Sequence, residues 1–322
     1  MQSAVRGVLI DVSGTVHVGD KLIPGAANAL ERLRSSGVPF RFCTNTTQSS
    51  GDSLASHLRK LGLDVHREEI FTSLSACRQL VQTRGLRPLL ILEPDAQREF
   101  EGIIHSEPYD SVVVGLSPSN FHYDMVGDRK TRLRPSPAPY TTGTTAIAAK
   151  NESELLNKAF RLLVESKSTT KPATLIAVHR AKYFADKDEG RLSLGPGGFV
   201  EALEYASGVK AHVVGKPQRA FFELAIQSMG LDHYLPSSST PSASSSMPSS
   251  SHSSLASGIV MIGDDVEQDL GGGAAELGLI RYLVRTGKYR AKDEERDAHG
   301  GLDGTFADFG AVVDHILSTL QK

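Results

Sequence analysis

The sequence predicts an α/β fold organised around a parallel sheet, and three observations support this fold class. Short apolar runs bounded by turn residues recur along the chain, which is typical of buried strands. Segments with apolar residues at three- and four-residue spacing lie between them, which is typical of amphipathic helices. Polar residues follow several of the apolar runs, at the edge where open α/β sheets bind ligands. Alternating strands and helices favour right-handed crossovers and therefore a parallel sheet.

The first predicted strand, Gly7–Asp11, is an apolar run that ends in a carboxylate and is followed by Gly14. The spacing of alanines and leucines predicts a helix over 26–33. A strand over 38–43 and a second helix over 53–61 come next. This strand–helix–strand–helix order predicts the first part of a parallel sheet.

A second pattern begins at about residue 87. Its predicted elements are strands over 88–92, 110–115 and 173–178 and a helix over 152–165. We expect residues 86–189 to form a second α/β unit, inserted into a core made of 1–85 and 190–322. Residues 127–151 carry charges and then several Pro, Thr and Gly residues, so we expect an insertion within the second unit.

The rest of the chain returns to the core. Its predicted elements are helices over 199–205, 221–225 and 312–316 and strands over 211–215, 258–263 and 279–284. Residues 236–257 are dominated by serine, and such a composition cannot bury enough apolar surface to become ordered. We expect a flexible insertion there.

The composition is that of an ordinary globular protein and excludes several function classes. Of the 322 residues, 39% are hydrophobic and 22% charged, and the net charge of -2 predicts no basic surface for nucleic acid. Cys43 and Cys77 are too few for a disulfide framework or a cysteine-built zinc site, and they favour the reducing cytoplasm. No run of about 18 apolar residues predicts a membrane span, and the strand at Gly7 leaves no room for a signal peptide. We therefore expect a cytoplasmic protein without a membrane or nucleic-acid partner.

Polar residues cluster after four of the predicted strands. The clusters are Asp11–Ser13, Thr44–Asn45, Gly215–Lys216, and Gly263–Asp265 with Asp269 beyond it. In a doubly wound sheet these strand ends can converge on one crevice. Each cluster alone also fits a helix cap or a solvated turn, so the functional argument depends on the ordered set.

The residue types in these clusters suit one chemistry. Asp11 and Asp264 offer the hard oxygen ligands that Mg2+ takes alongside phosphate and water. Thr44 offers a hydroxyl group, and backbone amides near it suit phosphate oxygens. Lys216 supplies a compact positive charge, and Asp269 is placed to hold that lysine. The set predicts phosphoryl chemistry in which Asp11 holds a cation or attacks phosphorus.

This ordered set resembles the haloacid dehalogenase superfamily of phosphohydrolases. The Pro24–Ala26 turn, Thr44–Thr46 and the large insertion resemble its subclass with a C2-type cap. Further segments resemble one branch of that subclass, at 70–74, 177–183, 194–197 and 286–290. The resemblance implies a Rossmann-like parallel core sheet with an inserted α/β C2-type cap domain. It also implies a homodimer, a Mg2+ cofactor, and as substrate a small phosphorylated molecule or a phosphorylated protein side chain.

Carried over by position, the resemblance implies that Asp11 is the nucleophile and a magnesium ligand. Ser13 would give the magnesium ion its main-chain carbonyl, and Asp264 would complete the protein ligands. Asp265 would either make a water-mediated contact or cap a turn. Asp269 would lie outside the ligands, as the partner of the lysine.

The other implied roles concern the substrate. Thr44 and Asn45 would bind the transferring phosphoryl group, and Lys216 would neutralise its charge. His179 and Lys182 belong to a cationic cluster after a predicted cap strand, and we expect them to contact an anionic substrate. A solvated loop is the alternative interpretation of that cluster.

Ser13 departs from the superfamily, whose phosphatases usually carry a second aspartate there as general acid and base. A serine hydroxyl is a poor acid near neutral pH, and losing general acid–base help typically removes about 10²–10⁴ in rate. We therefore expect phosphoramidates and inorganic pyrophosphate, which have better leaving groups, to react better than alkyl phosphates. His17 is an alternative proton-transfer group, although a surface or flap position explains it as well.

The sequence as a whole predicts a magnesium-dependent phosphatase that acts through an aspartyl-phosphate. The alternative is a phosphate- or protein-binding member of the same fold with weak turnover. Ser13 favours that alternative, whereas the intact Asp11, Lys216 and Asp264 count against it. Transfer of the phosphoryl group to an acceptor other than water is a third hypothesis.

Overall fold

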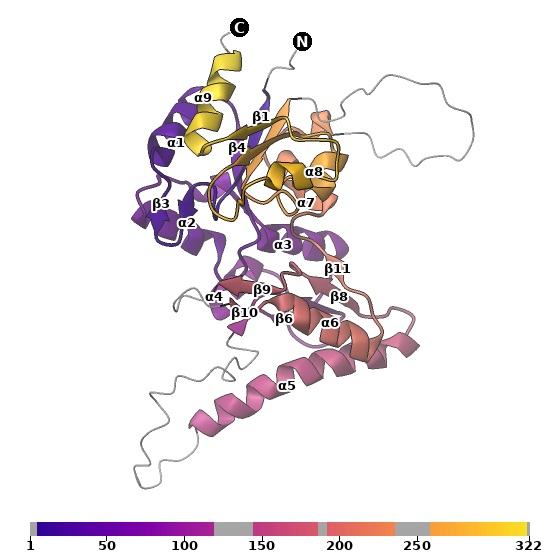
Figure 1. Cartoon of the computed structure of the whole chain (residues 1–322). Coiled ribbons are helices and arrows are strands. Elements are labelled where there is room, and N and C mark those ends of the chain that lie inside the picture. The colour runs from indigo at the N-terminus through magenta and orange to yellow at the C-terminus, as the bar shows by residue number, and fades with distance from the viewer. Residues whose placement is uncertain (1–4, 119–143, 186–191, 236–257, 321–322) are drawn as a thin grey trace, which may run out of the picture. The chain divides into compact units, whose positions relative to one another are not determined.

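The computed structural model describes residues 5–118, 144–185, 192–235 and 258–320, without the side chains of 144–154. The chain divides into two compact units. The first comprises Met1–Asn45, Gly51–Ala76 and Gly215–Lys322, and the second comprises Thr46–Ser50 and Cys77–Val214. Each unit has its own parallel sheet (Figure 1).

The first unit is built on a six-stranded sheet. Its strands are β1 (Gly7–Asp11), β4 (Phe40–Thr44), β5 (Ile70–Thr72), β12 (Ile259–Gly263), β13 (Ile280–Val284) and β14 (Gly304–Phe306). Their order is β14-β13-β12-β1-β4-β5, and all neighbouring pairs are parallel. The register pairs Asp11 with Cys43 and Thr44 with Thr72. The carboxyl ends of these strands therefore lie at one edge of the sheet.

Helices cover both faces of this sheet (Figure 1). They are α1 (Ala26–Ser35), α2 (Gly51–Lys60), α7 (Arg219–Gln227), α8 (Gly272–Glu276) and α9 (Phe309–Leu320). Successive side chains of a strand point to opposite faces, so Val8 and Ile10 share a core with α1, α2 and α9. Leu9, between them, belongs to a second core with α7 and α8. A strand buried on both faces must be apolar throughout, which explains the continuous apolar run in β1.

A short antiparallel hairpin follows β1. It consists of β2 (His17–Val18) and β3 (Lys21–Leu22). The turn into it has Gly14 at a φ of +99°, and the Gly14 amide donates a hydrogen bond to the His17 carbonyl at 2.7 Å. A Cβ atom on Gly14 would lie 1.9 Å from Asp264 Oδ2. Backbone conformation and space both require glycine here, because the turn packs directly against Asp264.

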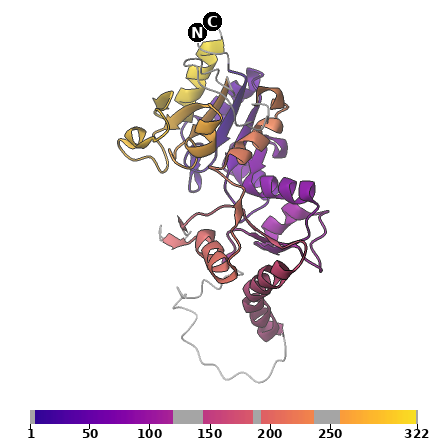
Figure 2. The same ribbon diagram turned by 90° about the vertical axis from the view of Figure 1, so that its right-hand side faces the viewer.

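The second unit has a four-stranded parallel sheet with two long helices on one face. Its elements are α3 (Ser73–Arg84, whose first residues belong to the first unit), β6 (Pro88–Ile91), α4 (Pro94–Gln97), β7 (Ser111–Val114), α5 (Thr144–Glu165), β8 (Thr174–Ala177), β9 (Tyr183–Ala185), β10 (Leu192–Leu194), α6 (Pro196–Ser207) and β11 (His212–Val213). The sheet order is β11-β8-β7-β6, and β9 and β10 form a separate antiparallel hairpin. Ile91 and Val114 from the sheet share a core with Leu163 of α5 and Val200 of α6. Figure 2 shows the ribbon of the chain from a second side.

This architecture confirms the predicted α/β class with a parallel core sheet. The second unit extends beyond the expected 86–189 and includes β11, because β11 pairs with β8. Residues 144–151, which belong to the expected insertion 127–151, lie in a helix. They form the start of α5, where alanines at 146, 148 and 149 favour helix. The other expected insertion residues, 127–143 and 236–257, include no residue that the structure describes.

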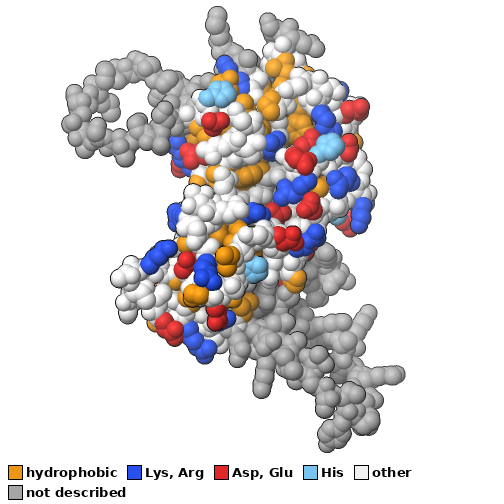
Figure 3. Space-filling view, turned by 180° about the vertical axis from the view of Figure 1, so that it is seen from behind, with side chains coloured by type: hydrophobic (Ala, Val, Ile, Leu, Met, Phe, Trp, Pro, Cys, Tyr) orange, Lys and Arg blue, Asp and Glu red, His pale blue; other side chains and the backbone are white. Residues whose placement is uncertain are grey.

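Within the described ranges, no helix combines the length and the apolar character needed to cross a bilayer. On the face that Figure 3 shows, Lys and Arg side chains are interspersed with Asp and Glu side chains. Cys43 and Cys77 are both buried, free thiols.

Candidate active site

Lys216 lies at the centre of a buried cluster of charges in the first unit. Its ammonium group donates hydrogen bonds to Asp11 Oδ1 at 2.5 Å, to Asp269 Oδ1 at 2.7 Å and to the Cys43 carbonyl at 2.9 Å. These acceptors use all the N–H donors of the ammonium group. Burial by itself would lower the pKa of Lys216, but the charges of Asp11 and Asp269 and their hydrogen bonds outweigh burial and raise it. The lysine therefore holds a fixed positive charge beside Asp11.

Asn45 fixes the backbone of Lys216. Its Oδ1 accepts a hydrogen bond from the Lys216 N–H at 2.9 Å, and its Nδ2 donates one to the Lys216 carbonyl at 2.9 Å. Because an N–H must donate to an oxygen, this pairing defines the orientation of the amide group. The contact ties the end of β4 to the loop before α7. The structure thus gives Asn45 a positioning contact that the sequence did not indicate.

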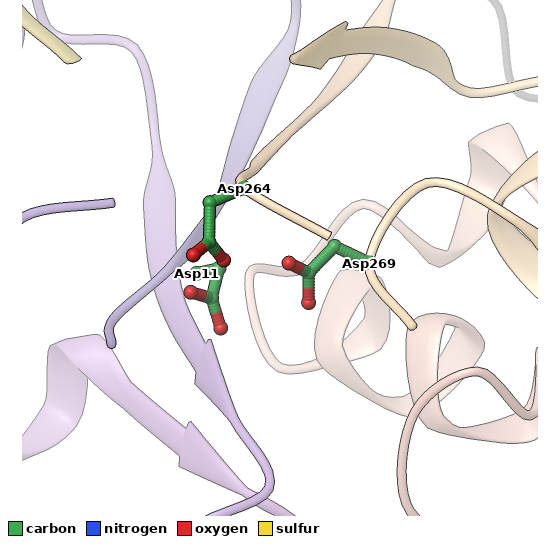
Figure 4. Close-up of side chains that lie close together, drawn as sticks. All are labelled: Asp11, Asp264 and Asp269. Carbon is green, nitrogen blue, oxygen red and sulfur yellow. The ribbon is translucent and has the colours of Figure 1, made fainter. Parts of the chain in front are cut away.

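Three aspartates converge beside Lys216. Asp11 ends β1, Asp264 and Asp269 lie in the loop after β12, and the three carboxylates lie close together (Figure 4). One carboxylate oxygen from each lies within 4.8 Å of the others. Burial, together with the charges of Asp11 and Asp269, raises the pKa of Asp264 to about 8. Burial and the charge of Asp11 likewise raise the pKa of Asp269 to about 6.

The two carboxylate oxygens of Asp264 differ in their surroundings. Oδ2 accepts a hydrogen bond from the Lys288 N–H at 2.6 Å. Oδ1 is buried and has no hydrogen-bond partner among the described residues. Leaving a buried carboxylate oxygen without a partner is costly, and a bound cation would remove that cost. The three carboxylates are the hard oxygen ligands that suit Mg2+, so this donor set fits a divalent cation.

The loop after β12 brings Asp269 and Asp265 into place. A Cβ atom on Gly263 would lie 2.4 Å from Asp269 Cβ, so the absence of a side chain lets Asp269 approach the strand end. Asp265 Oδ1 accepts hydrogen bonds from two backbone amides that follow in the loop, at 3.1 and 3.0 Å. Its Oδ2 lies 3.2 Å from Lys288 Nζ. These contacts are those of a turn-capping residue, which is one of the two roles considered for Asp265.

Ser13, Thr15 and Thr44 lie next to this cluster in sequence. The Ser13 side chain is exposed, and its backbone forms an isolated bridge with His17. Thr44 is buried at the end of β4. Thr15 Oγ1 donates to Asp11 Oδ2 at 3.3 Å, which is long for a hydroxyl–carboxylate hydrogen bond. Asp11 therefore has one oxygen held firmly by Lys216 and the other held weakly.

His17, the alternative proton-transfer group, lies in the β2–β3 hairpin and is mostly buried. Its Nδ1 is 2.8 Å from the Gly19 carbonyl. Its ring packs edge-on against the His57 ring, with centroids 6.0 Å apart. These contacts account for His17 as a hairpin residue, and its role in proton transfer stays a prediction.

The second unit holds the two cap residues that the sequence singled out. His179 is buried, its Nε2 lies 3.1 Å from Thr47 Oγ1, and its Nδ1 accepts a hydrogen bond from the Ala181 N–H at 3.2 Å. Burial lowers the pKa of His179 to about 4, so the ring is neutral near pH 7 and Nε2 carries the proton that it donates to Thr47. Lys182 is exposed. Substrate binding by His179 and Lys182 stays a prediction.

Sequence reasoning missed the site contacts of Thr286 and Lys288. Thr286 Oγ1 donates a hydrogen bond to the Gly14 carbonyl at 2.5 Å, and the Lys288 amide holds Asp264. Both residues follow β13, at the sheet edge that carries the other polar clusters. Their position after a predicted strand was the signal that would have found them.

Two family models match the chain. The haloacid dehalogenase-like hydrolase model matches residues 8–103, and a HAD-hydrolase-like model matches residues 213–309. Haloacid dehalogenase-like hydrolase domain-containing protein 2 from Homo sapiens is 40% identical over 317 residues, covering 98% of each chain. Phospholysine phosphohistidine inorganic pyrophosphate phosphatase from Xenopus laevis is 32% identical over 322 residues, covering 98% of this chain and 96% of the relative. These matches confirm the family that the motifs predict.

Solved structures show the same fold. A 4-nitrophenylphosphatase from Thermotoga maritima is 22% identical, with a TM-score of 0.69 and 97% coverage of both chains. NagD from E. coli K-12 is 18% identical, with a TM-score of 0.68, covering 95% of this chain and 98% of NagD.

Proposed function

The chain belongs to the haloacid dehalogenase-like hydrolases, and from this premise we propose that it is a magnesium-dependent phosphatase that acts through Asp11. The observation that carries the proposal is the hydrogen bond from Lys216 to Asp11, made within a cluster where Asp264 Oδ1 has no partner among the described residues. The Xenopus laevis relative and the Thermotoga maritima structure are both named as phosphatases, which supports the same reaction class here.

Asp11 is the nucleophile in this proposal. A carboxylate oxygen of Asp11 attacks phosphorus, the bond from phosphorus to the leaving group breaks, and an aspartyl-phosphate forms. Water then attacks phosphorus and breaks its bond to Asp11, which releases inorganic phosphate and restores the carboxylate. The fixed charge of Lys216 lies beside Asp11 Oδ1 and offsets negative charge on the transferring group. Asp269 keeps Lys216 in place, because its Oδ1 accepts one of the ammonium hydrogens.

Asp11, Asp264 and the main-chain carbonyl of Ser13 are the groups that would hold Mg2+. When bound, the ion supplies positive charge against the phosphoryl oxygens and helps to orient the substrate. Two features support this assignment: Asp264 Oδ1 has no partner in the described part of the chain, and the pKa of Asp264 is raised. Both features indicate that the cluster carries more negative charge than Lys216 balances.

Ser13 suggests the class of substrate. The usual general acid is replaced by a hydroxyl group, so the leaving group must depart without strong proton donation. Phosphoramidates and inorganic pyrophosphate meet that condition better than alkyl phosphates. The name of the Xenopus laevis relative includes phospholysine, phosphohistidine and pyrophosphate, which supports the same substrate class.

Thr44, Asn45 and the cap residues complete the proposal. Thr44 contributes to binding the phosphoryl group, and Asn45 contributes chiefly by holding the backbone of Lys216. In the second unit, Lys182 is an exposed cation that we propose contacts an anionic substrate, whereas His179 is a neutral, buried ring. A homodimer and a cytoplasmic location remain predictions.

A substrate panel tests the function. Phosphate release from 4-nitrophenyl phosphate, pyrophosphate, phospholysine and an alkyl phosphate would be measured with Mg2+ and with a chelator. We expect Mg2+-dependent turnover that is slowest on the alkyl phosphate. Asp11→Asn should lower the rate by about 10⁴-fold or more, as loss of a catalytic nucleophile does. Equal rates on alkyl phosphate and phospholysine would contradict the substrate class.

The alternative function makes a different prediction in the same assay. A binding protein with the same fold would show no turnover on any member of the panel, and Asp11→Asn would change nothing in the rates. Transfer to an acceptor other than water would consume the substrate without an equal yield of free phosphate. The binding alternative is supported by Ser13, which stands in place of the usual acid–base aspartate.

A further inference from the structure

Residues 286–288, which we call the clamp segment, contact both the turn after β1 and the end of β12. Thr286 Oγ1 donates a hydrogen bond to the Gly14 carbonyl at 2.5 Å. Two residues later, the Lys288 N–H donates one to Asp264 Oδ2 at 2.6 Å. One tripeptide therefore holds both neighbours of the proposed cation position: the peptide next to Ser13 and the carboxylate of Asp264.

Gly287 lets the clamp segment come this close. Its φ is +59°, a left-handed conformation that L side chains rarely adopt. A Cβ atom on Gly287 would lie 2.1 Å from Asp264 Oδ2 and 2.3 Å from Gly14 Cα. The side chain of Asp264 is thus packed between two glycine backbones, since a Cβ atom on Gly14 would also clash with Oδ2.

This packing makes the two oxygens of Asp264 unequal. Oδ2 is enclosed by Gly14 and Gly287 and is bound to the Lys288 amide, whereas Oδ1 is buried without a partner among the described residues. A carboxylate that could rotate freely would present either oxygen. The contacts on Oδ2 fix the rotation and leave Oδ1 as the available ligand atom.

We propose that Thr286, Gly287 and Lys288 are positioning residues that orient Asp264 Oδ1 and the Ser13–Gly14 peptide for a divalent cation. This inference rests on the proposed function, because it assumes that the cation is Mg2+ held by Asp11, Asp264 and Ser13. The clamp segment acts through the ligands and touches no reacting atom. Groups that orient metal ligands typically change metal affinity by about 10–100-fold when they are mutated.

The test is direct Mg2+ binding, measured by isothermal titration calorimetry on the full chain without substrate. Thr286→Val removes the hydroxyl donor and should weaken Mg2+ binding by about 10-fold or more, whereas Thr286→Ser, which keeps a hydroxyl group, should bind nearly as the wild type does. Gly287→Ala should weaken binding further, because its methyl group meets Asp264 and Gly14.

A second glycine separates this effect from backbone strain. Gly37 also has a left-handed φ, of +75°, but a Cβ atom there would lie more than 4 Å from the atoms of the described residues around it. Gly37→Ala should lower the unfolding temperature and leave Mg2+ affinity unchanged. If Gly287→Ala does not fold, the Thr286→Val and Thr286→Ser pair still decides the question.

The outcomes distinguish the two proposals. If the wild-type protein binds no Mg2+ at millimolar concentration, the proposed function fails. If the wild type binds Mg2+ and Thr286→Val binds it equally well, the proposed function is not affected. The positioning role of the clamp segment is then contradicted. Weaker binding by Thr286→Val, with rescue by Thr286→Ser, supports it.

Discussion

Two buried carboxylates, one in each unit, have pKa values that move in opposite directions. Asp264 in the first unit is 1% exposed and Glu204 in the second is 4% exposed. Burial raises the pKa of Asp264 to about 8, and neighbouring aspartates add to the effect. Burial would also raise the pKa of Glu204, but its hydrogen bonds and the charge of Arg180 outweigh burial and lower it.

The difference lies in their partners. Glu204 Oε1 accepts hydrogen bonds from the Ala211 N–H at 2.7 Å and from Arg180 Nη1 at 3.0 Å, and Oε2 accepts from Arg180 Nη2 at 3.2 Å and Lys210 Nζ at 3.4 Å. Both of its oxygens are paired. Asp264 instead faces other carboxylates and keeps one oxygen unpaired among the described residues.

The comparison separates two uses of a buried charge. Glu204 is a paired charge that joins α6 to the chain after it and stabilises the second unit. Asp264 faces like charges, which costs stability when its carboxylate is ionised, and in the proposed function a cation would offset that repulsion. Residues with pKa values shifted by burial and like charge are concentrated at functional sites, which agrees with the role proposed for Asp264.

The largest expected effect on stability comes from removing the positive charge of Lys216, which faces the aspartates. Lys216→Met should lower the free energy of unfolding by about 3–5 kcal/mol, because it leaves Asp11 and Asp269 buried without their counter-charge. Urea unfolding measures this. The matched control is Lys210→Met, whose side chain is 86% exposed beside Glu204 and whose loss should cost less than about 1 kcal/mol. Equal losses in the two variants would contradict the comparison.

A pH dependence of stability is the next largest effect. In the metal-free protein the pKa of Asp264 is raised from 3.8 to about 8, so folding takes up a proton between these values. The stability from this group is complete below about pH 4. It is lost as the pH rises through about 8. Between about pH 5.5 and about pH 7.5, the free energy of unfolding should fall by at most about 1.4 kcal/mol per pH unit.

Two controls sharpen this measurement. Asp264→Asn should reduce the slope, and saturating Mg2+ should reduce it as well, because a bound cation favours the ionised carboxylate. Glu204→Gln should leave the slope unchanged, since a carboxylate with a lowered pKa contributes stability above its ordinary value and loses it only in acid. A slope that survives in Asp264→Asn would have to come from another group.

The smallest effect is a difference in sign between two amide substitutions. Near pH 7.5 and without metal, Glu204→Gln should destabilise the protein by about 1–3 kcal/mol, because it weakens the hydrogen bonds of a buried charge. Asp264→Asn should instead stabilise it, by about 1 kcal/mol, because folding then no longer has to protonate a buried carboxylate that faces other carboxylates. Thermal unfolding of both variants in a chelator measures the pair. Destabilisation of similar size in both would remove the distinction between the two carboxylates.

Much of the fold was predictable because its signals are local. Apart from Asp11 at the end of β1, the runs that form β1 and β12 contain no polar side chain, since a strand covered on both faces has no solvent side. The sequence analysis did not predict β5 or α3. For β5 the reason is its length, because a strand of three residues is too short to show a period. The sequence did not predict the helix at residues 144–151, because neighbouring residues rich in Thr, Gly and Pro outweigh the helix propensity of three alanines.

The sequence by itself determined which residue types stand at the carboxyl ends of the strands, and so the class of chemistry they suit. Only the tertiary structure decided which atoms meet. Asn45 reaches the backbone of Lys216, 171 residues away, and the amide of Lys288 reaches one oxygen of Asp264 and leaves the other without a partner in the described chain. Such choices depend on side-chain rotation and backbone approach across separate segments, and no local pattern of residues encodes them.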